Sequence, residues 1–286
     1  MLYSFTGGSD GGYPAYGSLI MDNNGNLYGT TELDGHDAGT VYRLAPDGTE
    51  TVLHYFSEGS DGFGPEALVM DKKGNLWGTA CCGGNANGCG VIFKITTNGN
   101  EKLVHTFAGP PGDGCGPDAA LITDQSGNFY GTTPYGGEHR GGAVFKLAPD
   151  GSETLMFSFN LKGDGFFPFA GLIIDENENL FGAAVYGGAK DLGTVFEIAP
   201  DGTETVLHVF KRPAKQGSNP DGVIMDQAGN LYGTASSGGL AGCYGDTGCG
   251  VVFKLAPDGT EAVLHFFTGK KGDGSNPLGD LIADGA

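Results

Sequence analysis

Short apolar runs recur along the whole chain at a nearly constant spacing. In the first repeat they occupy residues 19–22, 26–31, 40–44 and 51–56. Runs of this length, bounded by Gly, Asn, Asp and Pro, are typical of β-strands, because a helix needs a longer segment with a period near 3.6 residues. The pattern therefore predicts an all-β chain with four strands in each repeat.

The second strand of each repeat carries the clearest motif, which reads GNLYGTT at residues 25–31. Its aromatic position recurs at steps of 49, 53, 51 and 51 residues, as Tyr28, Trp77, Tyr130, Phe181 and Tyr232. Periods of this size are typical of solenoids and propellers.

Tight turns connect the strands in pairs. Residues 22–25 (DNNG) separate the first and second strands, and residues 46–48 (PDG) separate the third and fourth. Such turns make neighbouring strands antiparallel, so each repeat is predicted to be a four-stranded meander. A ring of these sheets is a β-propeller. The longer, less regular loops then gather at the other end of the strands, where we expect binding.

The two ends of the chain complicate the number of blades. Residues 2–5 and 281–284 each read as one extra strand. We expect an all-β propeller of four-stranded antiparallel blades, five complete plus a partial sixth, so that the ring is five- or six-bladed. Residues 1–286 are expected to form a single propeller repeat domain, or a piece of a longer array. The opening residues read as a strand rather than a signal peptide.

The motifs of one repeat read in order as LIxD, GNLYGTT, a Gly-Gly loop, GTVFKL, PDGTE and VLHxF. This series resembles the bacterial GloVer tandem repeat of exported, surface-anchored proteins, and its first half is similar to the NHL-type propeller blade. The resemblance covers nearly the whole chain, although Glu178 replaces a turn glycine and TTN replaces APD at residues 96–98. It implies a propeller and an extracellular or cell-surface location, but no activity.

The chain is strongly acidic, with a formal net charge of −19. Such a surface repels phosphate backbones and anionic lipids, so nucleic acid and membrane surfaces are poor partners. Sequence runs of about 18 to 20 apolar residues, which membrane insertion requires, are absent. A cation or a neutral polysaccharide is easier to accommodate, and solubility alone also explains the charge.

The chain contains six cysteines, and four of them bracket two loops. Cys82–Cys89 and Cys243–Cys249 bracket equivalent Gly-rich loops of the second and fifth repeats, which predicts two disulfides. The remaining two, Cys81 and Cys115, are then expected to form a third. Complete pairing indicates an oxidising compartment. The alternative is a zinc site made of Cys81, Cys82, Cys89 and Cys115, although it lacks paired C-x-x-C motifs.

Four histidines occupy one position of the fourth strand, where another repeat has Phe157; they are His54, His105, His208 and His265. A position that accepts phenylalanine is predicted to be apolar packing. The aspartates that end the first strands, such as Asp22 and Asp71, are likewise predicted to accept backbone hydrogen bonds in the turns.

Acidic residues that break the repeat are more informative. Glu66, Asp118 and Asp221 directly follow the proline before the first strand, where other repeats have residues such as Phe169. The predicted geometry places them around the channel mouth. They are candidate catalytic carboxylates for cleaving a polysaccharide, where separations of about 5 to 9.5 Å matter. They are equally candidate ligands for calcium, or ordinary exposed turn residues.

Aromatic side chains in the same loops suggest a ligand surface, because flat rings stack on sugars. The candidate ligand-binding residues are Tyr16, Phe63, Tyr135, His139, Phe169, Tyr186 and Tyr244. Others must fill gaps between blades.

Three functions remain open from the sequence. The first is an exported, non-catalytic propeller that binds a carbohydrate or a cell-surface protein through its loop-rich face. The second is a polysaccharide hydrolase or lyase that uses Glu66, Asp118 and Asp221. The third is an architectural repeat segment of a larger surface protein. Motifs for nucleotide binding, a serine nucleophile or a zinc protease are absent.

Overall fold

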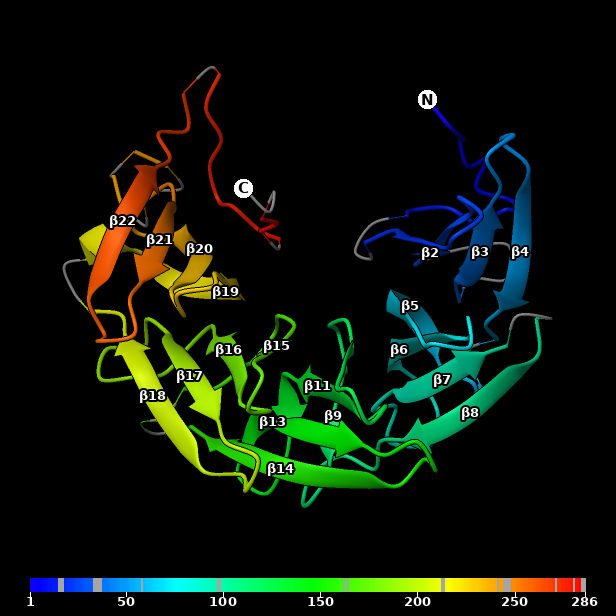
Figure 1. Ribbon diagram of the computed structural model, residues 1–286, viewed down its shortest axis with the longest axis horizontal. Coiled ribbons are helices and arrows are strands. Elements are labelled where there is room, and N and C mark those ends of the chain that lie inside the picture. The colour runs from blue at the N-terminus through cyan, green and yellow to red at the C-terminus, as the bar shows by residue number, and fades with distance from the viewer. Residues whose placement is uncertain are drawn as a thin grey trace. The chain divides into compact units, whose positions relative to one another are not determined.

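The computed structural model describes residues 1–14, 18–32, 38–57, 59–96, 99–161, 163, 165–211, 214–240, 242–243, 248–270, 272–279 and 281–283. Within them the chain forms five four-stranded antiparallel sheets and one two-stranded sheet (Figure 1). This confirms the all-β prediction. One short 3-10 helix, η1 (Ala214–Gln216), is present. Among the described residues, the structure contains no helix long and apolar enough to span a bilayer.

Each four-stranded sheet follows the chain in order. The first contains β1 (Ile20–Met21), β2 (Leu27–Thr31), β3 (Thr40–Leu44) and β4 (Glu50–Tyr55). The second contains β5 (Phe63–Met70), β6 (Leu76–Cys82), β7 (Val91–Ile95) and β8 (Glu101–Thr106). The third contains β10 (Ile122–Thr123), β11 (Phe129–Thr133), β13 (Arg140–Leu147) and β14 (Glu153–Asn160). The fourth contains β15 (Ile173–Ile174), β16 (Leu180–Ala184), β17 (Thr194–Ile198) and β18 (Glu204–Val209). The fifth contains β19 (Ser218–Met225), β20 (Leu231–Ser237), β21 (Val251–Leu255) and β22 (Glu261–Phe266).

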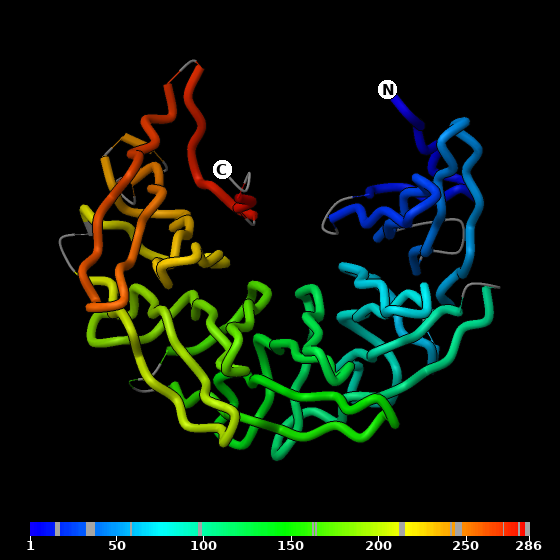
Figure 2. The backbone as a smooth tube through the Cα atoms, in the orientation of Figure 1, coloured from blue at the N-terminus to red at the C-terminus, as the bar shows by residue number. Residues whose placement is uncertain are grey.

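The small sheet pairs β9 (Gly114–Cys115) with β12 (Tyr135–Gly136). Figure 2 traces the backbone of the same strands as a tube through the Cα atoms. The residues divide into two compact units, each described below by itself: unit 1 is residues 1–137 with 144–155, and unit 2 is residues 138–143 with 156–286. The prediction of a single domain stays a prediction.

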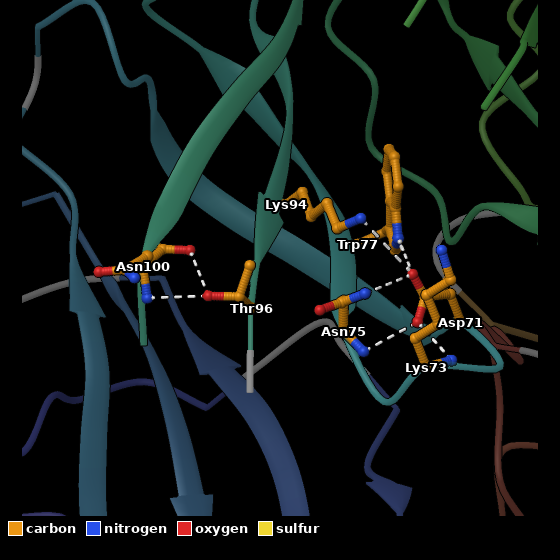
Figure 3. A network of polar contacts seen from close by, with 7 residues as sticks. All are labelled: Asp71, Lys73, Asn75, Trp77, Lys94, Thr96 and Asn100. Atoms are coloured by element: carbon orange, nitrogen blue, oxygen red, sulfur yellow. Dashed lines mark hydrogen bonds and ion pairs between the residues drawn. The ribbon is translucent and has the colours of Figure 1, made fainter. Parts of the chain in front are cut away.

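The turn between the first two strands of each sheet is held by its aspartate. In the second sheet Asp71 Oδ1 accepts hydrogen bonds from the backbone N–H groups of Lys73 and Asn75, both at 2.9 Å (Figure 3). Its Oδ2 accepts from Asn75 Nδ2 at 2.8 Å and Trp77 Nε1 at 3.0 Å. Burial raises the pKa of Asp71, but these bonds outweigh it and lower the pKa to about 2. The predicted turn role is confirmed.

A second repeated device lies where the chain enters each first strand. The residue before the proline has a left-handed backbone in all six copies, with φ between 52° and 71°. These residues are Tyr13, Gly64, Gly116, Phe167, Asn219 and Asn276. Gly and Asn tolerate this conformation, whereas Tyr13 and Phe167 adopt it at a cost of roughly 1 kcal/mol. The recurrence makes it a property of the fold.

Phenylalanines join neighbouring sheets inside each unit. In unit 1, Phe56 at the end of the first sheet lies 5.0 Å from Phe93 of the second, and their rings meet edge to face. In unit 2, Phe210 contacts Phe253 in the same manner at 5.4 Å. All four side chains are fully buried, so these contacts, repeated sheet after sheet, build the core that one sheet alone lacks.

The predicted strands at the two ends are wrong within the described residues. Residues 2–5 and 281–283 form no strand. Phe5 nevertheless packs edge to face on Tyr42 at 4.9 Å, which is the contact that Phe56 makes with Phe93. The packing position is therefore retained, but without a neighbouring third strand no backbone ladder forms there.

Candidate functional site

Glu66 lies at a β-bulge in β5. The pairing of β5 with β6 shifts register between Pro65 and Leu68. A bulge places an extra residue in one strand and turns its side chain away from the regular alternation. The backbone carbonyl of Glu66 accepts a hydrogen bond from the Thr30 hydroxyl of the first sheet, which fixes the bulge and leaves the carboxyl group available.

Asp118 and Cys81 meet Glu66 in unit 1. Asp118 lies in the loop between β9 and β10, and Cys81 lies near the end of β6. One donor atom from each of the three side chains falls within 4.8 Å of the others, and all three side chains are partly buried. The structure thus brings together two of the three carboxylates that the sequence singled out, and adds a thiol.

Burial sets the proton affinities of the two carboxyl groups. It raises the pKa of Glu66 to about 8, with the negative charges of Asp118 and Glu32 adding to the effect. It also raises the pKa of Asp118, to about 6. At neutral pH one carboxyl is therefore mainly protonated and the other mainly ionised. The pair offers one hydrogen-bond donor and one charged acceptor side by side.

Cys81 and Cys82 stand next to this pair with free thiols. Their sulfur atoms are 2.6 Å apart, and Cys81 Sγ also lies 3.8 Å from the Phe63 carbonyl oxygen. The contact between the sulfurs holds the proton on Cys81, so it raises the pKa of Cys81 and lowers that of Cys82.

The cysteine pairing corrects part of the sequence prediction. Cys243–Cys249 is a disulfide as predicted. Cys89, however, bonds to Cys115, so the predicted Cys82–Cys89 and Cys81–Cys115 bonds are wrong. Cys115 lies in β9, and the loop that carries β9 returns to the Gly-rich loop of the preceding repeat, where the Gly116 N–H donates to the Cys89 carbonyl at 2.9 Å. This pairing also removes the four-cysteine zinc site.

Asp221 occupies the equivalent bulge in unit 2. The register of β19 against β20 shifts between Pro220 and Val223, as it does around Glu66 in β5. Asp221 Oδ2 accepts a hydrogen bond from the Gly279 N–H at 2.7 Å. Its structural role is thus to hold the loop at residues 276–279, and convergence with Glu66 and Asp118 stays a prediction.

Two of the predicted aromatic residues lie beside the Glu66 cluster. Phe63 pairs with Cys82 across β5 and β6. Tyr135 pairs with Cys115 across β12 and β9, close to the Gly116 that precedes Pro117 and Asp118, and 48% of Tyr135 is exposed. An accessible ring therefore lies against the backbone two residues before Asp118.

Three of the other predicted ligand residues belong to unit 2. Tyr186 of unit 2 stacks at 5.5 Å on Phe166 and is 38% exposed. Phe169 is 45% exposed, and His139 is exposed, with its backbone N–H bonded to Ser158 Oγ at 3.2 Å. Tyr16 and Tyr244 lie outside the described residues.

The repeated histidines pack on phenylalanines as predicted, and His54, His105 and His265 also lie against aspartates, which the sequence did not lead us to expect. His105 meets Phe107 edge to face at 4.7 Å. Its Nε2 lies 3.6 Å from Asp113 Oδ2, and Glu153 of the third sheet completes a cluster within 4.8 Å. The His–Asp contact recurs as His54 with Asp61. The signal was present, because in three repeats an aspartate follows the histidine after seven or eight residues.

Both clusters contain metal-ligating side chains. The oxygens of Glu66 and Asp118 suit calcium, whereas the Cys81 thiol adds a soft donor that is typical of zinc sites. The His105 cluster offers one nitrogen and two carboxylates. Because its elements recur in the repeat, we assign that cluster to packing between sheets and treat the Glu66 cluster as the candidate site.

Comparison with known proteins agrees with the repeat architecture. The profile of the Gloeobacter/Verrucomicrobia repeat matches residues 1–177 and 151–286. Comparison with curated proteins gave no match.

Solved structures show the same fold. Streptogramin B lyase is similar with a TM-score of 0.59 and 16% identity, over 88% of this chain and 69% of that one. A gluconolactonase from Xanthomonas campestris is similar with a TM-score of 0.52 and 19% identity, over 90% of this chain and 77% of that one. At such identities the likeness shows the fold, a β-propeller type, and nothing of the chemistry.

Proposed function

The chain belongs to the Gloeobacter/Verrucomicrobia repeat family, and we propose that it is an exported propeller protein that binds a carbohydrate through the loops of unit 1. The proposed binding groups are Glu66 and Asp118, with Tyr135 as the stacking ring. These side chains come from three separate segments, which is how a repeat scaffold builds one site from irregular loops.

One observation carries this proposal: two partly buried carboxyl groups of different pKa meet in unit 1, and the exposed Tyr135 ring lies against Gly116, two residues before one of them. A sugar ring presents an apolar face that stacks on an aromatic ring, and hydroxyl groups that both donate and accept hydrogen bonds. A protonated Glu66 can donate to such a hydroxyl, and an ionised Asp118 can accept from one. A neutral sugar is also compatible with the acidic surface.

The disulfide bonds support the proposed extracellular location. Four of the six cysteines form disulfides, which persist in oxidising compartments. Together with the absence of a membrane-spanning helix from the described residues, this is compatible with an extracellular protein.

A glycan array tests the proposal with matched variants. We expect the wild type to bind a defined set of glycans, and Tyr135→Ala to bind them about tenfold more weakly, as the loss of one stacked ring implies. Tyr186→Ala, which removes an exposed tyrosine from unit 2, is the control and should bind like the wild type. Absence of binding to any glycan, or equal binding by Tyr135→Ala, would reject carbohydrate recognition at this site.

Catalysis is the second candidate, because Glu66 and Asp118 have the separated pKa values that an acid–base pair needs. The similarly folded structures include a lyase and a gluconolactonase by their names. If this chain cleaves a polysaccharide, Glu66→Gln and Asp118→Asn should each lower the rate at least 100-fold in a reducing-sugar assay. Unchanged rates in both variants would exclude the pair from chemistry, and Asp221→Asn tests the third predicted carboxylate.

A further inference from the structure

A groove of about 580 Å³ lies in unit 2 between the fourth and fifth sheets. Asp175, Phe181 and Glu197 line it from the fourth sheet, and Met225, Leu231 and Leu255 line it from the fifth. Asp175 and Ala228 belong to the turns between first and second strands. The groove is therefore at the turn end of the strands, opposite to the end that bears the bulge at Asp221.

In the other four sheets a basic residue takes the strand position that Glu197 occupies in the fourth sheet. In the second sheet Lys94 Nζ lies 4.6 Å from the centre of the Trp77 ring and 3.6 Å from Asp71 Oδ2 (Figure 3). The third and fifth sheets repeat the cation–π contact, as Lys146 over Tyr130 at 5.3 Å and Lys254 over Tyr232 at 5.4 Å. The first sheet has Arg43 paired with Tyr28 across β2 and β3.

The fourth sheet breaks this rule at two positions. Phe181 takes the aromatic place, and Glu197 stands opposite it in the register, where the other sheets carry Lys or Arg. Phe181 also lacks the O–H or N–H group that bonds the turn aspartate in the other four sheets. The internal cation is thus replaced by a second carboxylate, and the groove is lined by the Phe181 ring and by the acidic residues Asp175, Glu197 and Asp258.

We propose that this groove binds a primary ammonium group on an aliphatic chain, the chemistry of a lysine side chain. Asp175 and Glu197 supply the counter-charges for the ammonium, and Phe181 supplies the ring face, as Asp71 and Trp77 do for Lys94. The methylene stem lies along Met225, Leu231 and Leu255, since long basic side chains bury their stems and keep the charge at the polar end. The net charge of −19 favours the approach of such a cation.

This site lies in unit 2, at the turn end of the strands, and takes a cationic ligand, whereas the carbohydrate site lies in unit 1 and takes a neutral one. The inference therefore does not depend on the proposed function. Calorimetric titration with Nα-acetyl-lysine amide at low ionic strength tests it, with the neutral Nα-acetyl-norleucine amide as the comparison probe. Cadaverine, titrated separately, distinguishes a small free amine from a peptide lysine as the source of the ammonium. We expect binding of the lysine probe and no measurable binding of the norleucine probe.

Variants locate the site. Glu197→Gln should weaken binding of the lysine probe about tenfold, because one charge-assisted partner is lost. Glu197→Lys introduces the basic residue that the other four sheets carry at this position, so it should abolish binding of the lysine probe and raise the melting temperature. Glu176→Lys makes the same charge change at an exposed turn residue outside the groove and should bind like the wild type.

Three results would overturn the proposal. The first is equal affinity for the lysine and norleucine probes. The second is a Glu197→Gln variant that binds the lysine probe with wild-type affinity. This measurement tests the proposal even if Glu197→Lys fails to fold. The third is an equal loss of binding in Glu176→Lys and Glu197→Gln, because it would mean that the overall charge, and not the groove, holds the probe.

Discussion

Replacing Glu66 by glutamine should change how the stability of unit 1 depends on pH. In the folded protein burial and the nearby charges raise the pKa of Glu66 from 4.5 to about 8. Between these two pH values the folded protein keeps a proton that the unfolded chain has released. The free energy of unfolding therefore falls as the pH rises from about 4.5 to about 8, and the effect is complete above that.

The size of the effect follows from the same pKa values. The difference between 4.5 and about 8 corresponds to at most ~5 kcal/mol, since a tenfold change in proton affinity is worth about 1.4 kcal/mol. The side chain is only partly buried, so solvent screening reduces this, and we expect about 2 to 3 kcal/mol. Glutamine is neutral at every pH and does not lose this stability.

Urea unfolding at pH 5, 7 and 9 measures the difference. Trp77 is the single tryptophan of the chain and belongs to unit 1 with Glu66, so its fluorescence reports on this unit. Glu66→Gln should match the wild type at pH 5 and be more stable by about 2 to 3 kcal/mol at pH 9. Carboxyl groups with raised pKa outside this cluster, such as Glu153, titrate in both proteins and cancel in the comparison.

Glu176→Gln, at an exposed turn position, is the matched control and should follow the wild-type curve. If Glu66→Gln and the wild type lose stability in parallel from pH 5 to pH 9, then Glu66 is not the buried acid that its position in the bulge implies.

Three further predictions concern single features of the fold. Replacing Cys89 and Cys115 together by alanine should lower the free energy of unfolding by roughly 3.5 kcal/mol, because the bond spans 26 residues; urea unfolding without reductant measures it, and an unchanged midpoint would contradict the pairing. Thiol titration of the denatured, unreduced protein should find two free thiols, those of Cys81 and Cys82, and a count of zero would mean that these two are bonded as well. Phe181→Tyr should raise the free energy of unfolding by about 1 kcal/mol, because the new hydroxyl supplies the missing donor to the turn aspartate; thermal melting of the whole protein tests this, and a loss of stability would refute it.

The regular part of the fold was predictable because the same pattern of strands and turns recurs in every repeat. The strands, both kinds of hairpin and the hydrogen-bonding role of Asp22 and its equivalents follow from periodicity and turn chemistry, which act locally. The extra strands predicted at the two ends of the chain are absent from the described residues 2–5 and 281–283 for the opposite reason. A strand requires a neighbour, and local apolar character cannot supply one.

The candidate site was predictable in part. Glu66 and Asp118 were identified because they depart from the repeat, and the structure brings them together in unit 1. The cysteine partners were not, since Cys89 and Cys115 meet through the path of the loop after β8, which spacing alone does not determine. The change at Glu197 was visible in the sequence as an acidic residue in a column of Lys and Arg, but its meaning required the position of Phe181 opposite it.

The bulges in β5 and β19 have a consequence for making variants of this protein. A residue at a bulge neither fills the core nor completes the backbone ladder, so its identity is weakly constrained by folding. Position 66 could therefore be randomised together with the residue at 135, both in unit 1, while Asp221, whose carboxylate holds the loop at residues 276–279, and the rest of each sheet keep their native sequence. Variants from such a library could be selected for binding to new molecules at little cost to the folding stability of the sheets.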